Sequence, residues 1–166
     1  MVNKVLDIAR YVINYANDKN TSISNLQLQK IIYYIQAAFL VEKNKKCFEE
    51  DILNWTYGPV VQEVYNEFRV YGNSPIEIQK NYLELELDKK TGRINFKTKL
   101  FNDDVINELD RELINKVVDA YSKKTPFELV KKTHSEAPWR NTKQNEVINT
   151  DSIRDFYAVE TEKLYK

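Results

Sequence analysis

Ser24-Asn25-Leu26-Gln27-Leu28-Gln29-Lys30-Ile31-Ile32-Tyr33-Tyr34-Ile35 is the stretch that decides the fold of this 166-residue chain. Its apolar residues recur at every third or fourth position, which is the period of an α-helix with one face in the core. Ser24 is suited to cap the first turn, and Gln27, three residues on, completes a capping box. We therefore predict a long helix from Ser24 to Phe39. The apolar positions of its core face are Leu28, Ile31, Ile32, Ile35 and Phe39.

The same helical period recurs in five other segments, so the predicted fold class is mainly α. The small number of glycines and prolines, three and four, also favours long regular elements. Gly58 and Pro59 are expected to open the third helix, because a proline at the first helical position has no N–H to leave unpaired. Thr125, with Pro126 after it and Glu128 three residues on, predicts the start of the fifth. The first helix is expected from its apolar stripe, Val5 to Ala16, and the other expected starts are at Asn102 or Asp103 and near Thr150.

Between the third and fourth predicted helices the apolar period changes from helical to alternating. Leucines alternate with acidic residues over 83–88, and after a turn at 89–92 the alternation resumes over 94–98. This pattern predicts one small β-hairpin, whose apolar face should lie on the helices because an isolated hairpin is marginally stable in water. The predicted architecture is a compact bundle of about six helices with this hairpin inserted, α+β by strict count. Residues 1–166 are expected to form a single domain with a frayed tail at 160–166.

The charge balance argues against nucleic acid as the main partner. The chain has 25 Lys and Arg against 25 Asp and Glu, whereas a protein that neutralises phosphates normally has a basic excess. Cys47 is the only cysteine, so neither an intrachain disulfide nor a zinc–cysteine cluster is expected. The first residues lack the apolar core of a secretory signal, and no run approaches the ~20 apolar residues of a membrane helix. We expect a cytoplasmic protein without a metal or cofactor.

His134 is the only histidine, so any catalytic imidazole must be this one, and a two-histidine metal site is excluded. A pairing of His134 with Cys47, or a hydrolase or transferase that uses His134 with a carboxylate such as Glu136, remains an alternative. No glycine-rich phosphate loop is present, because the three glycines stand far apart. The expected role of His134 is therefore structural, at a helix end.

The aromatic residues are the most informative part of the composition, with 11 Tyr, 7 Phe and 2 Trp. Tyrosine combines an apolar ring with a polar tip and is enriched at interface hot spots. Tyr33 and Tyr34 are adjacent on the predicted helix, so at least one of them is expected near the surface. The candidate partner-binding residues are Tyr34, Tyr57 and Tyr71.

Three blocks of sequence together carry a family resemblance. They are Leu26–Tyr34, Trp55–Tyr65 and Thr133–Arg140. In this order and spacing they resemble the Panacea-domain family, which includes SocA-like antitoxins and GepA-type phage-associated proteins, and the resemblance covers roughly residues 4–157. The motif positions, expected to be structural, are Gln29, Lys30, Trp55, Gly58, Pro59, Tyr65, His134 and Trp139.

The resemblance implies an antitoxin encoded beside a toxin gene, a non-enzymatic module that neutralises its toxin by direct binding. One SocA-like branch implies an alternative, an adaptor that delivers the toxin to a cytosolic AAA+ protease. A mobile-element inhibitor of a host defence protein would use the same kind of surface. The family pairs one domain type with unrelated toxins, so the resemblance leaves the toxin and the oligomeric state open.

Overall fold

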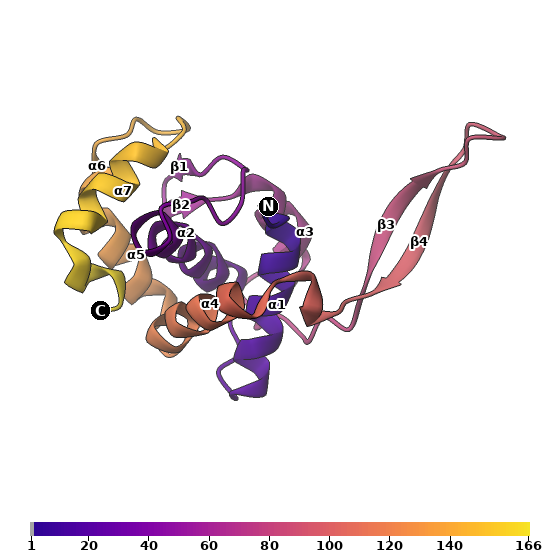
Figure 1. Cartoon of the computed structure of the whole chain (residues 1–166), viewed down its shortest axis with the longest axis horizontal. Coiled ribbons are helices and arrows are strands. Elements are labelled where there is room, and N and C mark those ends of the chain that lie inside the picture. Colours follow the sequence, from indigo (N-terminus) through magenta and orange to yellow (C-terminus); the bar gives the residue numbers. More distant parts are fainter. Residues whose placement is uncertain (1) are drawn as a thin grey trace.

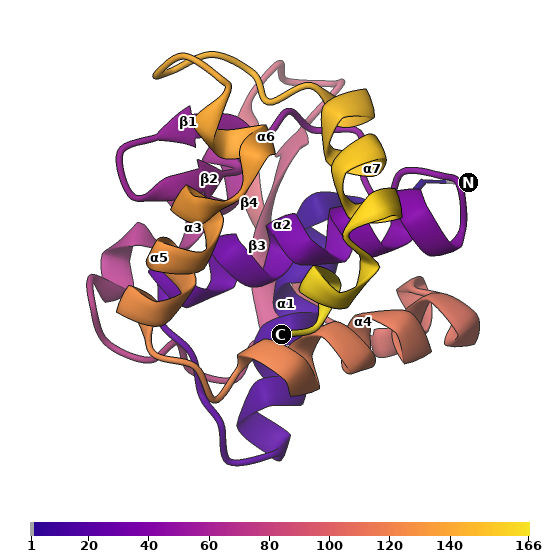
Figure 2. The same cartoon turned by 90° about the vertical axis from the view of Figure 1, so that its left-hand side faces the viewer.

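Helix α2 (Asn25–Glu42) runs through the centre of the helical body (Figure 2) in the computed structural model, which describes residues 2–166. The capping box predicted at its start is confirmed, since Ser24 Oγ accepts from the Gln27 N–H and the Gln27 side chain accepts from the Ser24 N–H. Every residue over 28–40 is buried, including the polar ones. The helix is therefore enclosed on all sides and not only along its apolar stripe.

The other helices pack around α2, which confirms the mainly helical fold class (Figure 1). Helices α1, α4, α5 and α7 contact it directly along its length, and the shorter α3 contacts its first half. Buried side chains of these helices form one hydrophobic cluster with α2. The helices around α2 are α1 (Val5–Asp18), α3 (Gln62–Phe68), α4 (Glu108–Tyr121), α5 (Pro126–Ser135), α6 (Ala137–Arg140) and α7 (Thr150–Val159).

Helix α4 begins later than the sequence predicts. Asn102 caps only a short 3₁₀ turn, η2 (Asp103–Val105), and the helix itself is capped by Asn107, whose side chain accepts from the Asp110 N–H. Leu109 is consequently in the first turn on the outside and is 69% exposed. The local capping bond of Asn107 thus decides the boundary that the apolar period alone misplaced.

The C-terminal segment is ordered, so the prediction of a frayed tail over 160–166 is wrong. It forms a 3₁₀ turn, η3 (Thr161–Leu164), whose Leu164 is buried against the core. Tyr121 Oη donates to the Leu164 carbonyl at 2.5 Å, and Lys132 Nζ donates to the Lys163 carbonyl at 2.7 Å. These bonds satisfy backbone groups that a frayed end would leave to water.

Gly58 and Pro59 do not open a helix. They lie in strand β2 (Gly58–Val60), which is antiparallel to β1 (Leu53–Trp55), and α3 begins only at Gln62. Pro59 is tolerated because β1 takes its other partner, the segment 146–148, on the opposite side and leaves β2 as an edge strand. The positive φ of Gly58, 113°, makes the turn between the two strands.

The hairpin predicted over 83–98 is present, but its apolar face does not lie on the helices. Strands β3 (Asn81–Leu87) and β4 (Ile94–Leu100) pair in register and project from the helical body (Figure 1). The ring of Tyr82 lies 4.0 Å from the Arg10 guanidinium of α1, so the face that Tyr82 shares with the acidic residues is turned to the helices. The polar first turns of α1 suit this charged face, and the leucine face points away.

Candidate partner-binding pocket

Two polar residues of α2 hold the backbone of the β1–β2 hairpin. Gln29 Oε1 accepts from the Val61 N–H at 3.0 Å, and Lys30 Nζ donates to the Pro59 carbonyl at 3.0 Å. Both side chains are buried, although polar groups in a core are costly unless they are hydrogen-bonded. Gln29 and Lys30 belong to the first sequence block, and they hold the backbone of the second block in place.

Gly58 allows this close approach. A Cβ atom at position 58 would lie 2.6 Å from Lys30 Cε and 2.8 Å from Thr133 Oγ1, closer than van der Waals contact permits. The hairpin thus lies directly on the Lys30 side chain and on the third sequence block. Burial disfavours the charged form of the amine, and it lowers the pKa of Lys30 to about 7.

We expect the stability of the protein to depend on pH through Lys30. The pKa of an unfolded lysine is about 10.4, so between pH 7 and that value the unfolded chain binds more protons than the folded one. The free energy of unfolding contributed by Lys30 therefore rises with pH, and the penalty for burying the ammonium is complete below pH 7. Urea unfolding at pH 6 to 9 gives the free energy of unfolding of the wild type and of Lys30→Met, which has no charge at this position.

The difference in unfolding free energy between wild type and Lys30→Met should be constant below pH 7. Above pH 7 it should grow in favour of the wild type by up to about 1.4 kcal/mol per pH unit. Groups that titrate equally in both proteins, such as the Cys47 thiol, cancel in this difference. A difference that stays constant from pH 6 to 9 would contradict the lowered pKa of Lys30 in the folded protein.

Aromatic residues from the second and third blocks join on the other side of the hairpin. The Trp55 ring meets the Tyr65 ring edge-on at 5.0 Å, and Trp139 Nε1 donates to the Trp55 carbonyl at 3.1 Å. His134 stacks on Trp139 with ring centres 3.8 Å apart. Each of these motif residues therefore contacts another motif residue.

His134 is held in a partly buried position against Trp139. Burial lowers its pKa, and its Nε2 atom is enclosed without a hydrogen-bond partner among residues 2–166. Cys47 lies elsewhere, buried beside Asn3, and burial raises the pKa of its thiol. The structure therefore does not assemble the Cys47–His134 pair. Within residues 2–166 no cluster of His, Cys, Asp and Glu has the arrangement of a metal site.

A pocket of about 640 Å³ opens beside the motif residues. Trp55 and Tyr65 form part of its wall, and Tyr57, 67% exposed, stands at its rim. Arg69 is the one charged residue among those that line it, so an apolar group next to an acidic one would suit the pocket. Sequence reasoning missed Arg69 and also Asn25, which receives a bond from Gln29 and donates to the Tyr65 carbonyl.

The three tyrosines proposed for binding have different surroundings. Tyr57 is exposed and lines the pocket. Tyr71 lies at the end of the 3₁₀ turn η1 (Arg69–Tyr71), next to the pocket residue Gly72, and is partly buried against the core. Tyr34 is wrong as a surface residue, because it is fully buried. The expectation that Tyr33 or Tyr34 reaches the surface fails because the C-terminal helices cover that side of α2.

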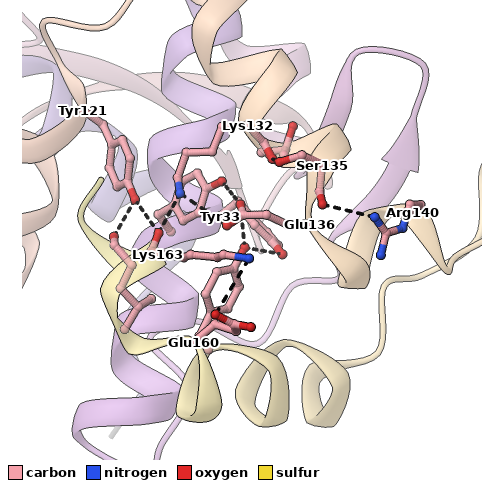
Figure 3. A network of polar contacts seen from close by, with 12 residues as sticks. Tyr33, Tyr121, Lys132, Ser135, Glu136, Arg140, Glu160 and Lys163 are labelled. Atoms are coloured by element: carbon pink, nitrogen blue, oxygen red, sulfur yellow. Dashed lines mark hydrogen bonds and ion pairs between the residues drawn. The ribbon is translucent and has the colours of Figure 1, made fainter.

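Tyr34 belongs instead to a buried polar network (Figure 3) centred on the Glu136 carboxylate. Glu136 Oε1 accepts from the hydroxyls of Tyr34 and Tyr157, the latter at 3.0 Å, and Oε2 accepts from Lys132 Nζ at 3.2 Å. Tyr157 Oη also lies 3.2 Å from Tyr33 Oη. Burial raises the pKa of these three tyrosines. The network joins α2, α5 and α7.

This network also bears on the enzyme alternative, a site formed by His134 with a carboxylate such as Glu136. The titratable groups gather around Glu136 and not around His134, and the carboxylate is saturated by donors from its own chain. Figure 3 shows Glu136 pointing into the interior between the helices. In the third block, Trp139 donates to the carbonyl of the pocket residue Trp55, whereas Glu136 lies in the core.

Fold and site together define a mainly helical protein in which buried polar residues of α2 hold a hairpin beside a surface pocket. The model of the family described as "Antitoxin SocA-like, Panacea domain" matches residues 28–140, which include most of the first sequence block and all of the other two. The chain belongs to this family of SocA-like antitoxins.

One curated relative is Antitoxin SocA of Caulobacter vibrioides (strain NA1000 / CB15N), which is 38% identical over 68 residues. The aligned part is 39% of this chain and 36% of the relative, so the similarity spans about a third of the length of that protein. No solved structure matches the chain. Within residues 2–166 no helix is long and apolar enough to cross a membrane.

Proposed function

We propose that this protein is a cytosolic antitoxin that neutralises a cognate toxin by direct binding at the Trp55–Tyr57–Tyr65 pocket. The observation that carries the proposal is the pocket itself, because residues of the segment that the family model matches, Trp55 and Tyr65 among them, line it and Tyr57 is exposed at its rim. The protein acts as a binding module without a reaction of its own.

The pocket favours a toxin segment of a particular chemistry. Its wall is aromatic and amide-rich, and Arg69 supplies its one positive charge. An aromatic or branched apolar side chain would fill it, and a neighbouring Asp or Glu would pair with Arg69. Tyrosine and arginine at the edge of a desolvated pocket are typical of binding hot spots.

Tyr57→Ala tests the proposal in a growth assay with the toxin gene that adjoins the coding sequence. Because Tyr57 is exposed, the variant should keep its fold, weaken toxin binding by about 2 kcal/mol or more, and lose the rescue of growth. Tyr71→Ala should weaken binding less, because its ring packs partly on the core. Phe127→Ala is the matched control, since Phe127 is 76% exposed and does not line the pocket.

Measurement of the toxin level in the same cells separates direct binding from delivery to a protease. Neutralisation by binding leaves the amount of toxin unchanged while growth is restored, and an adaptor lowers it. Full rescue and unaltered complex formation by both Tyr57→Ala and Arg69→Ala would show that the pocket is not the binding site.

A further inference from the structure

The β3–β4 hairpin turns an uncharged, apolar face to solvent. Its register places Leu83 opposite Thr98, Leu85 opposite Phe96 and Leu87 opposite Ile94 on one face. None of these side chains is covered by the helical body, from which the hairpin projects (Figure 1). The exposed fractions are 63% for Leu83, 61% for Leu85, 64% for Leu87, 67% for Ile94, 71% for Phe96 and 82% for Leu100.

The side chains on the opposite face of the hairpin already have partners within the chain. Lys99 pairs with Glu84, Lys97 Nζ lies 3.6 Å from a Glu86 carboxylate oxygen, and Tyr82 packs under Arg10. Its charges are balanced within the hairpin, and its base is held by α1. Only the apolar face therefore lacks the contacts that stabilise a two-stranded sheet in water.

The size of the apolar face fits a protein interface. At about 100 Å² for each side chain, the six apolar residues offer roughly 600 Å². A monomeric protein rarely exposes more than a few hundred Å² in one apolar patch. A standard interface buries about 800 Å² per partner, so this face approaches what a reversible dimer needs.

We propose that the apolar face of the β3–β4 hairpin packs against the same face of a second copy of this chain. The face carries no charged residue, so two copies can meet under the twofold symmetry of most homodimers without burying a charge. Two such hairpins would stack as two sheets about 10 Å apart, with Leu85 and Phe96 near the middle of the contact.

The rest of the molecule permits this pairing. The formal net charge of the chain is zero, so two copies do not repel each other at long range. Because the hairpin extends beyond the helices, two hairpins can stack while the helical bodies stay apart (Figure 1). No residue of the hairpin lines the pocket, so the dimer would leave the proposed toxin site open. The inference is therefore independent of the proposed function.

The test is the mass of the purified full chain, measured by sedimentation equilibrium from about 1 to 100 μM. The wild type should reach twice the 19.7 kDa of one chain within this range. Phe96→Lys places a charge in the middle of the face and should raise the dimer dissociation constant at least ~30-fold. Lys97→Ala lies on the same strand but on the other face and should remain a dimer.

Circular dichroism and the melting temperature of dilute Phe96→Lys confirm that the helical body is intact, since Phe96 is exposed. A second probe is Leu85→Cys, which a thiol-specific cross-linker that spans about 10 Å should join to the same residue of the second copy, whereas it should not join Glu84→Cys on the other face. A wild type that stays monomeric at 100 μM would overturn the proposal, and so would a dimer that Phe96→Lys leaves unchanged. Protection of the face only when the toxin is added would also overturn it and would assign the face to the toxin.

Discussion

Replacing Glu136 with alanine should lower the free energy of unfolding by about 3–5 kcal/mol, the usual cost of removing one partner from a buried charge pair. The carboxylate is 2% exposed and accepts from Tyr34, Tyr157 and Lys132. Its removal leaves the Lys132 ammonium without its counter-ion and two hydroxyls without their acceptor. The loss affects the contact of α2 with α5 and α7 at once.

Urea unfolding of the purified protein measures this effect. Glu136→Gln should lower the free energy of unfolding less than Glu136→Ala does, because the amide oxygen still accepts from a tyrosine hydroxyl although the charge is gone. Lys131→Ala is the matched control, since Lys131 is exposed on the same helix and should change the stability by less than about 0.5 kcal/mol. A loss below about 1 kcal/mol in Glu136→Ala would show that the network does not stabilise the fold.

Gly58→Ala should cost about 2–4 kcal/mol, for two separate reasons. The backbone at Gly58 has a φ of 113°, where a side chain is strained. The new Cβ would also lie 2.6 Å from Lys30 Cε, so the lysine must move and its bond to the Pro59 carbonyl is weakened. Movement of Lys30 shifts the hairpin that forms one wall of the pocket.

Gly92→Ala separates these two reasons. Gly92 also has a positive φ, 69°, but a Cβ there would meet nothing within 4 Å. It should therefore lose only the part of the stability that comes from backbone strain, about 1 kcal/mol. If thermal unfolding shows that Gly58→Ala and Gly92→Ala lose the same amount of stability, the close packing of the hairpin on Lys30 does not contribute to the stability of the fold.

Local signals in the sequence were sufficient for the helix starts that depend on hydrogen bonds between neighbours. The Ser24–Gln27 and Thr125–Glu128 capping boxes are present as predicted, because each closes within four residues. The proline rule failed at Pro59, since the position of that residue is decided by Lys30 and Gln29, about thirty residues away. A motif of this kind is understood only when its distant partners are known.

The same limit applies to the surface. Alternation correctly predicted the pairing of β3 with β4, but it could not tell which face meets the helices, and the contact of Tyr82 with Arg10 decides that. Tyr34 was a candidate for partner binding because it is adjacent to Tyr33 on the helix, and at least one of the two was expected near the surface. Its hydroxyl meets Glu136, 102 residues further along the chain, and this pairing has no local signal. Of the proposed binding tyrosines, Tyr57 has the exposure and the pocket that binding requires.

Isothermal titration into this protein of a purified candidate toxin, the product of a gene found beside its own, with no protease present, tests direct binding at the pocket. We expect a saturable complex with the wild type and with Phe127→Ala, and a dissociation constant raised about 30-fold or more by Tyr57→Ala. No binding by the wild type, or affinity that Tyr57→Ala leaves unchanged, would contradict direct neutralisation at this pocket.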